Sequence, residues 1–235
     1  MVYILLFLSY YSHFALSTKY EIQKTSIDIN NVKLAVTYGL PLNIFNTNSS
    51  FPVLLEYLPY RKDDSMYPER FSYLDYFASS GFIYGFIDIR GTGGSEGERI
   101  AYEYSDVEIE DYIQIIEKVS KYEWTLSDGL TTIKSNGKVG LWGQSWSACS
   151  LFVLAGKKAR DSRLEPLKTA IPIHCAVDLY NGDIHYMDGI FHMDEYILSV
   201  DHETMLPSYG FGGAASVNTY PLDQDYIARR VIHTL

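Results

Sequence analysis

The segment Lys138-Val-Gly-Leu-Trp-Gly-Gln-Ser-Trp-Ser-Ala-Cys149 predicts a short buried strand, an abrupt turn and then a helix. Within it, Gly143-Gln-Ser-Trp-Ser147 is close to the Gly-x-Ser-x-Gly nucleophile elbow, in which small residues let a strained backbone reverse direction. We therefore predict that Ser145 lies exposed on the turn. Ser147 stands where the elbow normally has its second glycine, and it adds a Cβ where the strand and the helix approach each other.

A serine at such a turn is a candidate nucleophile. Because a hydroxyl attacks poorly at neutral pH, the chemistry also needs a base, a group that orients the base, and donors for the developing oxyanion. The alternative is a plain strand-turn-helix in which Ser145 caps the helix. The apolar strand before it and Lys157-Lys158 near the helix end, where cations suit the helix dipole, favour the nucleophile.

The composition indicates one globular domain. The chain has 235 residues, of which 47% are hydrophobic and 15% aromatic, enough for a single large core. A net charge of -10 argues against nucleic acid or an anionic membrane as a partner. Cys149 and Cys175 fit neither a disulfide framework nor a zinc site, so we expect two buried thiols.

Residues 1–17 resemble a secretory signal peptide, with an apolar run and small residues at Ala15 and Ser17. The run is too short to predict a stable membrane span. The sequence leaves localisation open between secreted and cytoplasmic, with secretion favoured. Asn48-Ser-Ser50 is a glycosylation sequon that matters only if the chain is secreted.

The rest of the chain alternates strands with helices. We predict an antiparallel hairpin of 21–29 and 32–40, with its turn at Asn30-Asn31. Further strands are predicted at 51–58, 82–89 and 169–177. One helix is predicted at 67–80, and a second begins at the capping box Ser105-Asp-Val-Glu108. We expect the apolar face of that second helix to consist of Val107, Ile109, Tyr112, Ile113, Ile116 and Val119. Residues 124–137 are predicted as a polar connection. Residues 186–200 are predicted as a helix within an insertion that follows the last strand.

This order predicts an α/β fold, a mostly parallel sheet covered on both faces with the N-terminal hairpin as its antiparallel edge. Ligands of such sheets lie at the carboxyl ends of the strands. Four polar residues fall at those ends: Tyr60, Arg90, Ser145 and Asp178. We divide the chain into a possible signal peptide (1–17), a partial core (18–178) and the start of a helical cap (179–235).

No cofactor is expected. The loop Arg90-Gly-Thr-Gly-Gly-Ser-Glu-Gly97 lacks the Lys-Ser/Thr of a phosphate-binding loop, and Glu96 takes the place of the third glycine of a dinucleotide fingerprint. The spacing of His185, Asp188, His192 and Asp194 does not put a defined set of metal ligands on one face.

Four segments together resemble the X-prolyl dipeptidyl-peptidase/cocaine-esterase family of α/β-hydrolases, over about residues 20–205. They are Leu58-Pro-Tyr-Arg61, the glycine loop 90–97, Asn136-Gly-Lys-Val-Gly140 and the elbow 143–147. The resemblance implies hydrolysis of an ester or amide, possibly an X-Pro dipeptidyl bond, through an acyl-enzyme. It also implies Ser145 as the nucleophile, and the hydroxyl of Tyr60 and the backbone N–H of Trp146 as oxyanion donors. Arg90 and Asp88 are expected to tie loops together, Glu96 and Asp63 to be solvated, and Asp111 to need no role.

The acid and the base are not identifiable in this chain. The resemblance places both after the helical cap, and we expect the sequence to end within that cap. Asp178 could orient a base, but none of the five histidines after Ser145 (174, 185, 192, 202 and 233) follows a recognisable strand in the required order. We therefore expect a complementing C-terminal segment or an oligomer to complete the site. The alternative function is a catalytically dead remnant that binds a ligand or partner through the same pocket.

Overall fold

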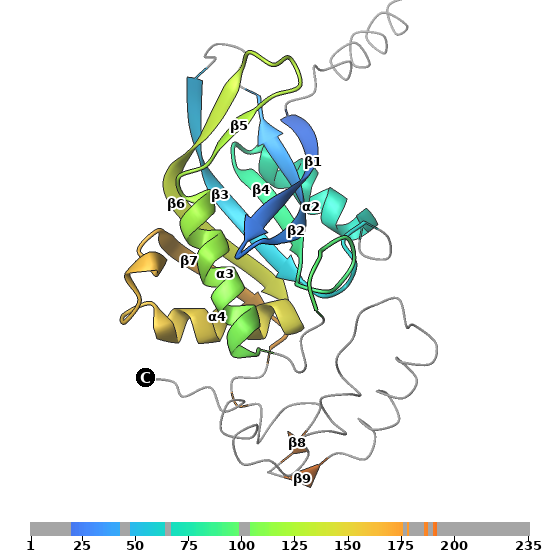
Figure 1. Cartoon of the computed structure of the whole chain (residues 1–235), viewed down its shortest axis with the longest axis vertical. Coiled ribbons are helices and arrows are strands. Elements are labelled where there is room, and N and C mark those ends of the chain that lie inside the picture. Colours follow the sequence, from blue (N-terminus) through green and yellow to red (C-terminus); the bar gives the residue numbers. More distant parts are fainter. Residues whose placement is uncertain are drawn as a thin grey trace, which may run out of the picture.

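The structure is a computed structural model that describes residues 20–42, 48–63, 67–98, 104–175, 178, 186–187 and 190–191. Its centre is a seven-stranded sheet in the order β1-β2-β4-β3-β6-β5, with β7 also pairing with β6 (Figure 1). The strands are β1 (Tyr20–Ile29), β2 (Val32–Pro41), β3 (Asn48–Leu58), β4 (Ile83–Asp88), β5 (Glu123–Thr125), β6 (Thr132–Gln144) and β7 (Leu167–Ile173). Strands β4, β3, β6 and β7 run parallel, which confirms the predicted mostly parallel α/β sheet.

The antiparallel hairpin β1-β2 forms one edge of the sheet, as predicted. Its turn residues Asn30 and Asn31 have φ of 54° and 64°, the left-handed pair that a two-residue hairpin turn requires and that asparagine tolerates. Strand β2 then pairs antiparallel with β4, so the hairpin extends the parallel core of the sheet.

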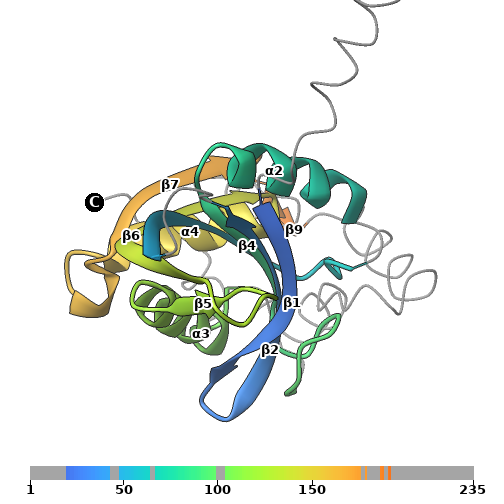
Figure 2. The same cartoon turned by 90° about the horizontal axis from the view of Figure 1, so that it is seen from above.

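Helices cover both faces of the sheet (Figure 2). Helix α2 (Tyr67–Ser79) lies on one face, where Leu74 packs with Leu58, Phe86 and Trp142. Helices α3 (Asp106–Val119) and α4 (Trp146–Lys157) lie on the other face, over the larger core cluster. A short 3-10 helix, η1 (Ser162–Leu164), leads from α4 into β7.

Two of the sequence predictions for secondary structure are wrong. Residues 124–137 are not a polar connection, because β5 and the first half of β6 occupy most of that range. The turn-forming residues Asn136 and Gly137 fall at a register shift between β3 and β6, so an irregularity in the strand accommodates them. Trp124, only 1% exposed, anchors β5 by packing edge-on against Tyr38.

The second error concerns 186–200, predicted as a helix. Tyr186–Met187 and Ile190–Phe191 pair instead as the short antiparallel strands β8 and β9. The remainder of that helix lies outside the described residues, as do the signal peptide predicted at 1–17 and most of the cap predicted at 179–235. The division of the chain into three parts therefore stays a prediction.

Candidate active site

The elbow lies where β6 ends and α4 begins. Ser145 has φ 57° and ψ −122°, a strained conformation for a residue with a side chain. Its N–H donates to the carbonyl of Ile173 in β7 (2.9 Å), and its own carbonyl accepts from the N–H groups of Ala148 and Cys149. Its side chain makes no cap hydrogen bond to the helix, which argues against the interpretation of Ser145 as a capping serine.

The elbow brings strand and helix into contact at Gly143. A Cβ on Gly143 would lie 2.6 Å from the carbonyl carbon of Ser147 and 2.8 Å from its Cβ. Ser147 is fully buried at this contact, so its own Cβ fits in place of the second glycine. The first glycine of the motif is therefore a strict steric requirement, whereas the second is not.

Tyr60 reaches the elbow from the loop after β3. Its hydroxyl oxygen accepts the backbone N–H of Trp146 at 3.1 Å and is also hydrogen-bonded to the side chain of Ser145. Burial raises the pKa of Tyr60, although these two hydrogen bonds oppose the rise. Ser145, Tyr60 and Trp146, the three residues that the family resemblance implies, therefore lie in contact. The raised pKa keeps the Tyr60 phenol protonated near neutral pH.

Asp88, at the end of β4, holds the backbone around Tyr60. Its carboxylate accepts the N–H of Lys62 (2.8 Å) and the N–H of Gly94 (2.9 Å) in the glycine loop. Gly93, at φ +51°, lies so close that a Cβ would be 2.2 Å from this carboxylate. The glycine loop is therefore packed against Asp88, which ties loops together as predicted.

Glu108 lies behind the elbow and is 1% exposed. Its carboxylate accepts the indole N–H of Trp146 (3.1 and 3.2 Å to its two oxygens), the hydroxyl of Ser150 (2.9 Å) and the N–H of Tyr104 (2.9 Å). The sequence indicated Glu108 only as part of a capping box, and Ser105 does accept its N–H at 3.3 Å. The capping pattern gave no signal of the contacts to α4.

Residues 30–210 match the family described as X-Pro dipeptidyl-peptidase (S15 family). The chain belongs to this family. No curated protein matches the sequence.

Two solved structures show that this S15 family member has the α/β-hydrolase fold. A CocE/NonD family hydrolase from Staphylococcus aureus superposes with a TM-score of 0.64 at 17% identity, over 93% of this chain and 42% of its own. A putative dipeptidyl aminopeptidase IV from Bacteroides ovatus gives a TM-score of 0.55 at 15% identity, over 93% of this chain and 26% of its own. The chain thus spans less than half the length of either.

The two cysteines of this S15 family member form a disulfide, which corrects the prediction of buried thiols. Cys149 in α4 and Cys175, two residues beyond β7, are bonded with their Cα atoms 5.4 Å apart. The bridge joins the two elements that border Ser145. Spacing alone could not reveal it, because the pairing depends on how β7 docks beside β6.

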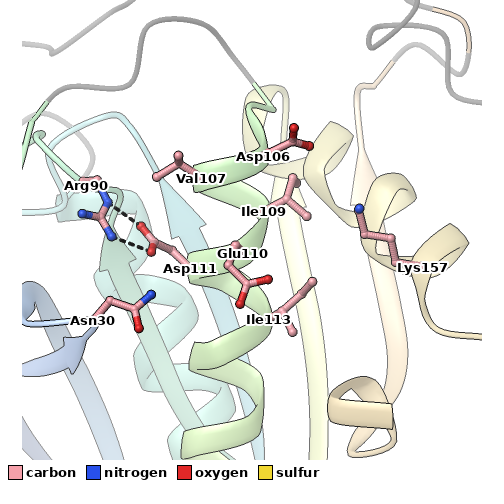
Figure 3. A pocket seen from close by; sticks show the side chains of 9 residues that line it. All are labelled: Asn30, Arg90, Asp106, Val107, Ile109, Glu110, Asp111, Ile113 and Lys157. Atoms are coloured by element: carbon pink, nitrogen blue, oxygen red, sulfur yellow. Dashed lines mark hydrogen bonds and ion pairs between the residues drawn. The ribbon is translucent and has the colours of Figure 1, made fainter. Parts of the chain in front are cut away.

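Arg90 and Asp111 form a two-pronged ion pair beside the α3 helix, with distances of 2.8 and 2.7 Å (Figure 3). Asp111 is 1% exposed and holds the guanidinium of Arg90, so the prediction that it needs no role is wrong. Val107, predicted on the apolar face, is exposed instead. Glu96 and Asp63 are exposed as expected, and Asp63 pairs with Lys24 at 2.7 Å.

The ion pair borders a cavity of about 500 Å³ between α3 and the β1-β2 turn (Figure 3). Its lining residues carry both charge signs, and Ser145 is not among them. The guanidinium of Arg90, the arginine that lines this cavity, is already paired with Asp111, so it is not available to an anionic ligand.

Two of the candidate acid and base residues fall within the described part of the chain. His174 directly follows Ile173, whose carbonyl holds Ser145, and has φ 55° with an exposed side chain. Asp178 is half-buried.

Among the described residues, no group of three or more His, Cys, Asp or Glu side chains could hold a metal ion. Nor does any helix described in the structure have the length and apolar character needed to cross a membrane.

Proposed function

We propose that this protein is a serine hydrolase that cleaves esters or amides, X-Pro dipeptidyl bonds among them, through an acyl-enzyme. Ser145 is the nucleophile, and the Tyr60 hydroxyl and the Trp146 N–H are the oxyanion donors. The observation that carries the proposal is the 3.1 Å contact between the Tyr60 oxygen and the Trp146 nitrogen, made beside the strained serine. A substrate carbonyl attacked by Ser145 would develop its negative charge at this place.

In the proposed reaction, Ser145 Oγ bonds to the carbonyl carbon as its proton passes to a base, and the C=O bond becomes a single bond to an oxyanion. The Trp146 N–H, which donates to the phenol in the free protein, turns to the oxyanion, and the phenol donates its own proton alongside. The leaving group departs with the proton from the base. Water then attacks the acyl-enzyme, releases the acid and restores Ser145.

The state of the phenol supports this role. Burial raises the pKa of Tyr60, so the hydroxyl keeps its proton and can donate it. Both donors already lie beside Ser145, so stabilising the oxyanion needs only the exchange of the hydrogen bond between them, and such preorganised donors supply much of the catalytic effect.

We propose that a segment added beside β7, or a second chain, supplies the base and acid. Strand β7 pairs with β6 along one edge. No other described strand pairs with the opposite edge of β7, and Ile171 within β7 is 45% exposed. Another parallel strand at this edge would end next to Ile173 and so bring a following loop close to Ser145. Small esters, amides or peptides are the proposed substrates.

A fluorophosphonate probe tests the proposal, because it reacts with a serine only when a base activates it. We expect the full-length protein to be labelled and the Ser145→Ala variant not to be labelled, with the exposed Ser162→Ala as a control that keeps the label. Wild-type protein that stays unlabelled would contradict the hydrolase and favour the alternative, a binding remnant.

A further inference from the structure

Glu108 is a buried carboxylate that the proposed reaction does not use. It occupies the first turn of α3, yet its side chain bonds to two residues of α4 that are one helical turn apart, Trp146 and Ser150. A capping box needs the bond from the Glu108 N–H to Ser105 and one bond from the Glu108 side chain back to the backbone at the helix start, here the N–H of Tyr104. The contacts across to α4 go beyond that local role.

These contacts fix the start of α4, which is also the elbow. Both carboxylate oxygens accept the indole N–H of Trp146, and Tyr104, whose N–H binds the same carboxylate, places its ring edge-on against the indole at 5.9 Å. Trp146 is 4% exposed, so its side chain has little room to turn. The backbone N–H of the same residue is the proposed oxyanion donor, and its direction depends on how the indole is held.

We propose that Glu108 is a positioning residue whose carboxylate, by holding the Trp146 indole, orients the Trp146 N–H for the oxyanion. This inference rests on the proposed hydrolase function. Glu108 acts through Trp146 and does not touch the substrate.

The protonation state of Glu108 decides whether it can do this. The ionised form offers only acceptors and meets three donors, whereas the protonated form turns one acceptor into a donor that faces another donor. Burial raises its pKa to about 7, against the hydrogen bonds from Ser150, Trp146 and Tyr104. We therefore expect the positioning contact to weaken as the pH falls below about 7.

Other ionisable groups act on Glu108 from neighbouring positions. Asp111 on its own helix raises the pKa of Glu108 further, although Arg90 pairs with that aspartate. Tyr112 from α3 and Tyr57 from β3 also interact with it electrostatically, and burial keeps the pKa of both phenols well above its ordinary value. Both tyrosines therefore stay neutral while Glu108 titrates.

The first test is kinetic, in the full-length protein. Glu108→Gln keeps the shape of the side chain but replaces one acceptor oxygen with a donor. Since a small misplacement of a catalytic group can cost up to about 100-fold, we expect kcat to fall at least about tenfold with KM nearly unchanged. The acidic limb of the pH profile should lose the titration that Glu108 contributes near pH 7 and keep only that of the catalytic base. Glu110→Gln, on the exposed side of the same helix, is the matched control and should leave the profile unchanged.

The second test does not depend on activity. In a nitrogen–proton correlation spectrum we expect one indole signal from each tryptophan, and the signal that is lost in Trp146→Phe is that of Trp146. We expect the Trp146 signal to shift with a midpoint near pH 7 and to lose this shift in Glu108→Gln. The Trp124 indole, for which the described residues provide no hydrogen-bond partner, is the internal control.

The outcomes separate the two proposals. A Trp146 signal that does not respond between about pH 5 and about pH 9, or a Glu108→Gln variant with wild-type kcat and pH profile, overturns the role of Glu108 alone. Failure of wild-type protein to react with the fluorophosphonate probe overturns the hydrolase, and this role with it.

Discussion

Reduction of the disulfide between Cys149 and Cys175 should destabilise the protein by an amount that follows from the loop it closes. The two cysteines are 26 residues apart. In the chain-entropy model, a loop of this length restricts the unfolded state by roughly 12 cal/mol/K, or about 3.5 kcal/mol at 25 °C. Many small domains are stable by only about 5–15 kcal/mol, so this would be a large share.

Urea denaturation with and without a reducing agent measures the effect. We expect the reduced protein to unfold at a lower urea concentration, by an amount equivalent to about 3.5 kcal/mol. Cys175→Ser should match the reduced wild type and should not respond to the reductant. Because Ser145 donates its N–H to Ile173, two residues before Cys175, hydrogen exchange at the Ser145 amide should also become faster on reduction.

Two results would refute this reasoning. One is the titration of two free thiols in native protein purified without reductant. The other is a difference in unfolding free energy below about 0.5 kcal/mol between oxidised and reduced protein, since that is within the range of ordinary surface substitutions.

Two further substitutions test the fold around the site. Gly143→Ala, in β6, places a Cβ against the Ser147 backbone and should destabilise the protein by about 1–3 kcal/mol. The control Gly156→Ala, in α4 with open space around it, should be neutral or stabilising, and equal effects of the two variants in thermal melts would contradict the close approach. Arg70→Met leaves Glu56 buried without its ion pair and should cost about 3–5 kcal/mol in denaturant unfolding. The control Arg163→Met breaks a half-exposed pair and should cost less than about 1 kcal/mol, so similar losses would show that burial of the Arg70 pair is not decisive.

Periodicity predicted much of the fold because the elements concerned bury one face or both. The hairpin, β3, β4, α2 and α3 follow from apolar runs, turn residues and a capping box. The first half of β6 escaped prediction because its polar residues pair with β3 and β5, so long-range partners rather than a local pattern make it a strand. The burial of Asp111 was not predicted for a similar reason. Helix α3 is packed on more than one side, and the ion pair with Arg90 compensates the charge of Asp111.

Short sequence motifs predicted the residues of the site that belong to them. The elbow motif indicated Ser145, and the family resemblance indicated Tyr60 and Trp146. Glu108 and the cysteine pair were missed because each acts on a partner 26 or more residues away. The disulfide bears on localisation as well: such bonds persist mainly in oxidising compartments, and this supports the expectation of secretion.

Tyr60→Phe tests the central proposal most directly, because it removes the hydroxyl that accepts the Trp146 N–H beside Ser145 and leaves the ring in place. We predict that kcat of the full-length enzyme on an ester substrate falls about 100-fold, equivalent to about 3 kcal/mol, with KM and thermal stability little changed. A variant that hydrolyses the ester with wild-type kcat would contradict the account.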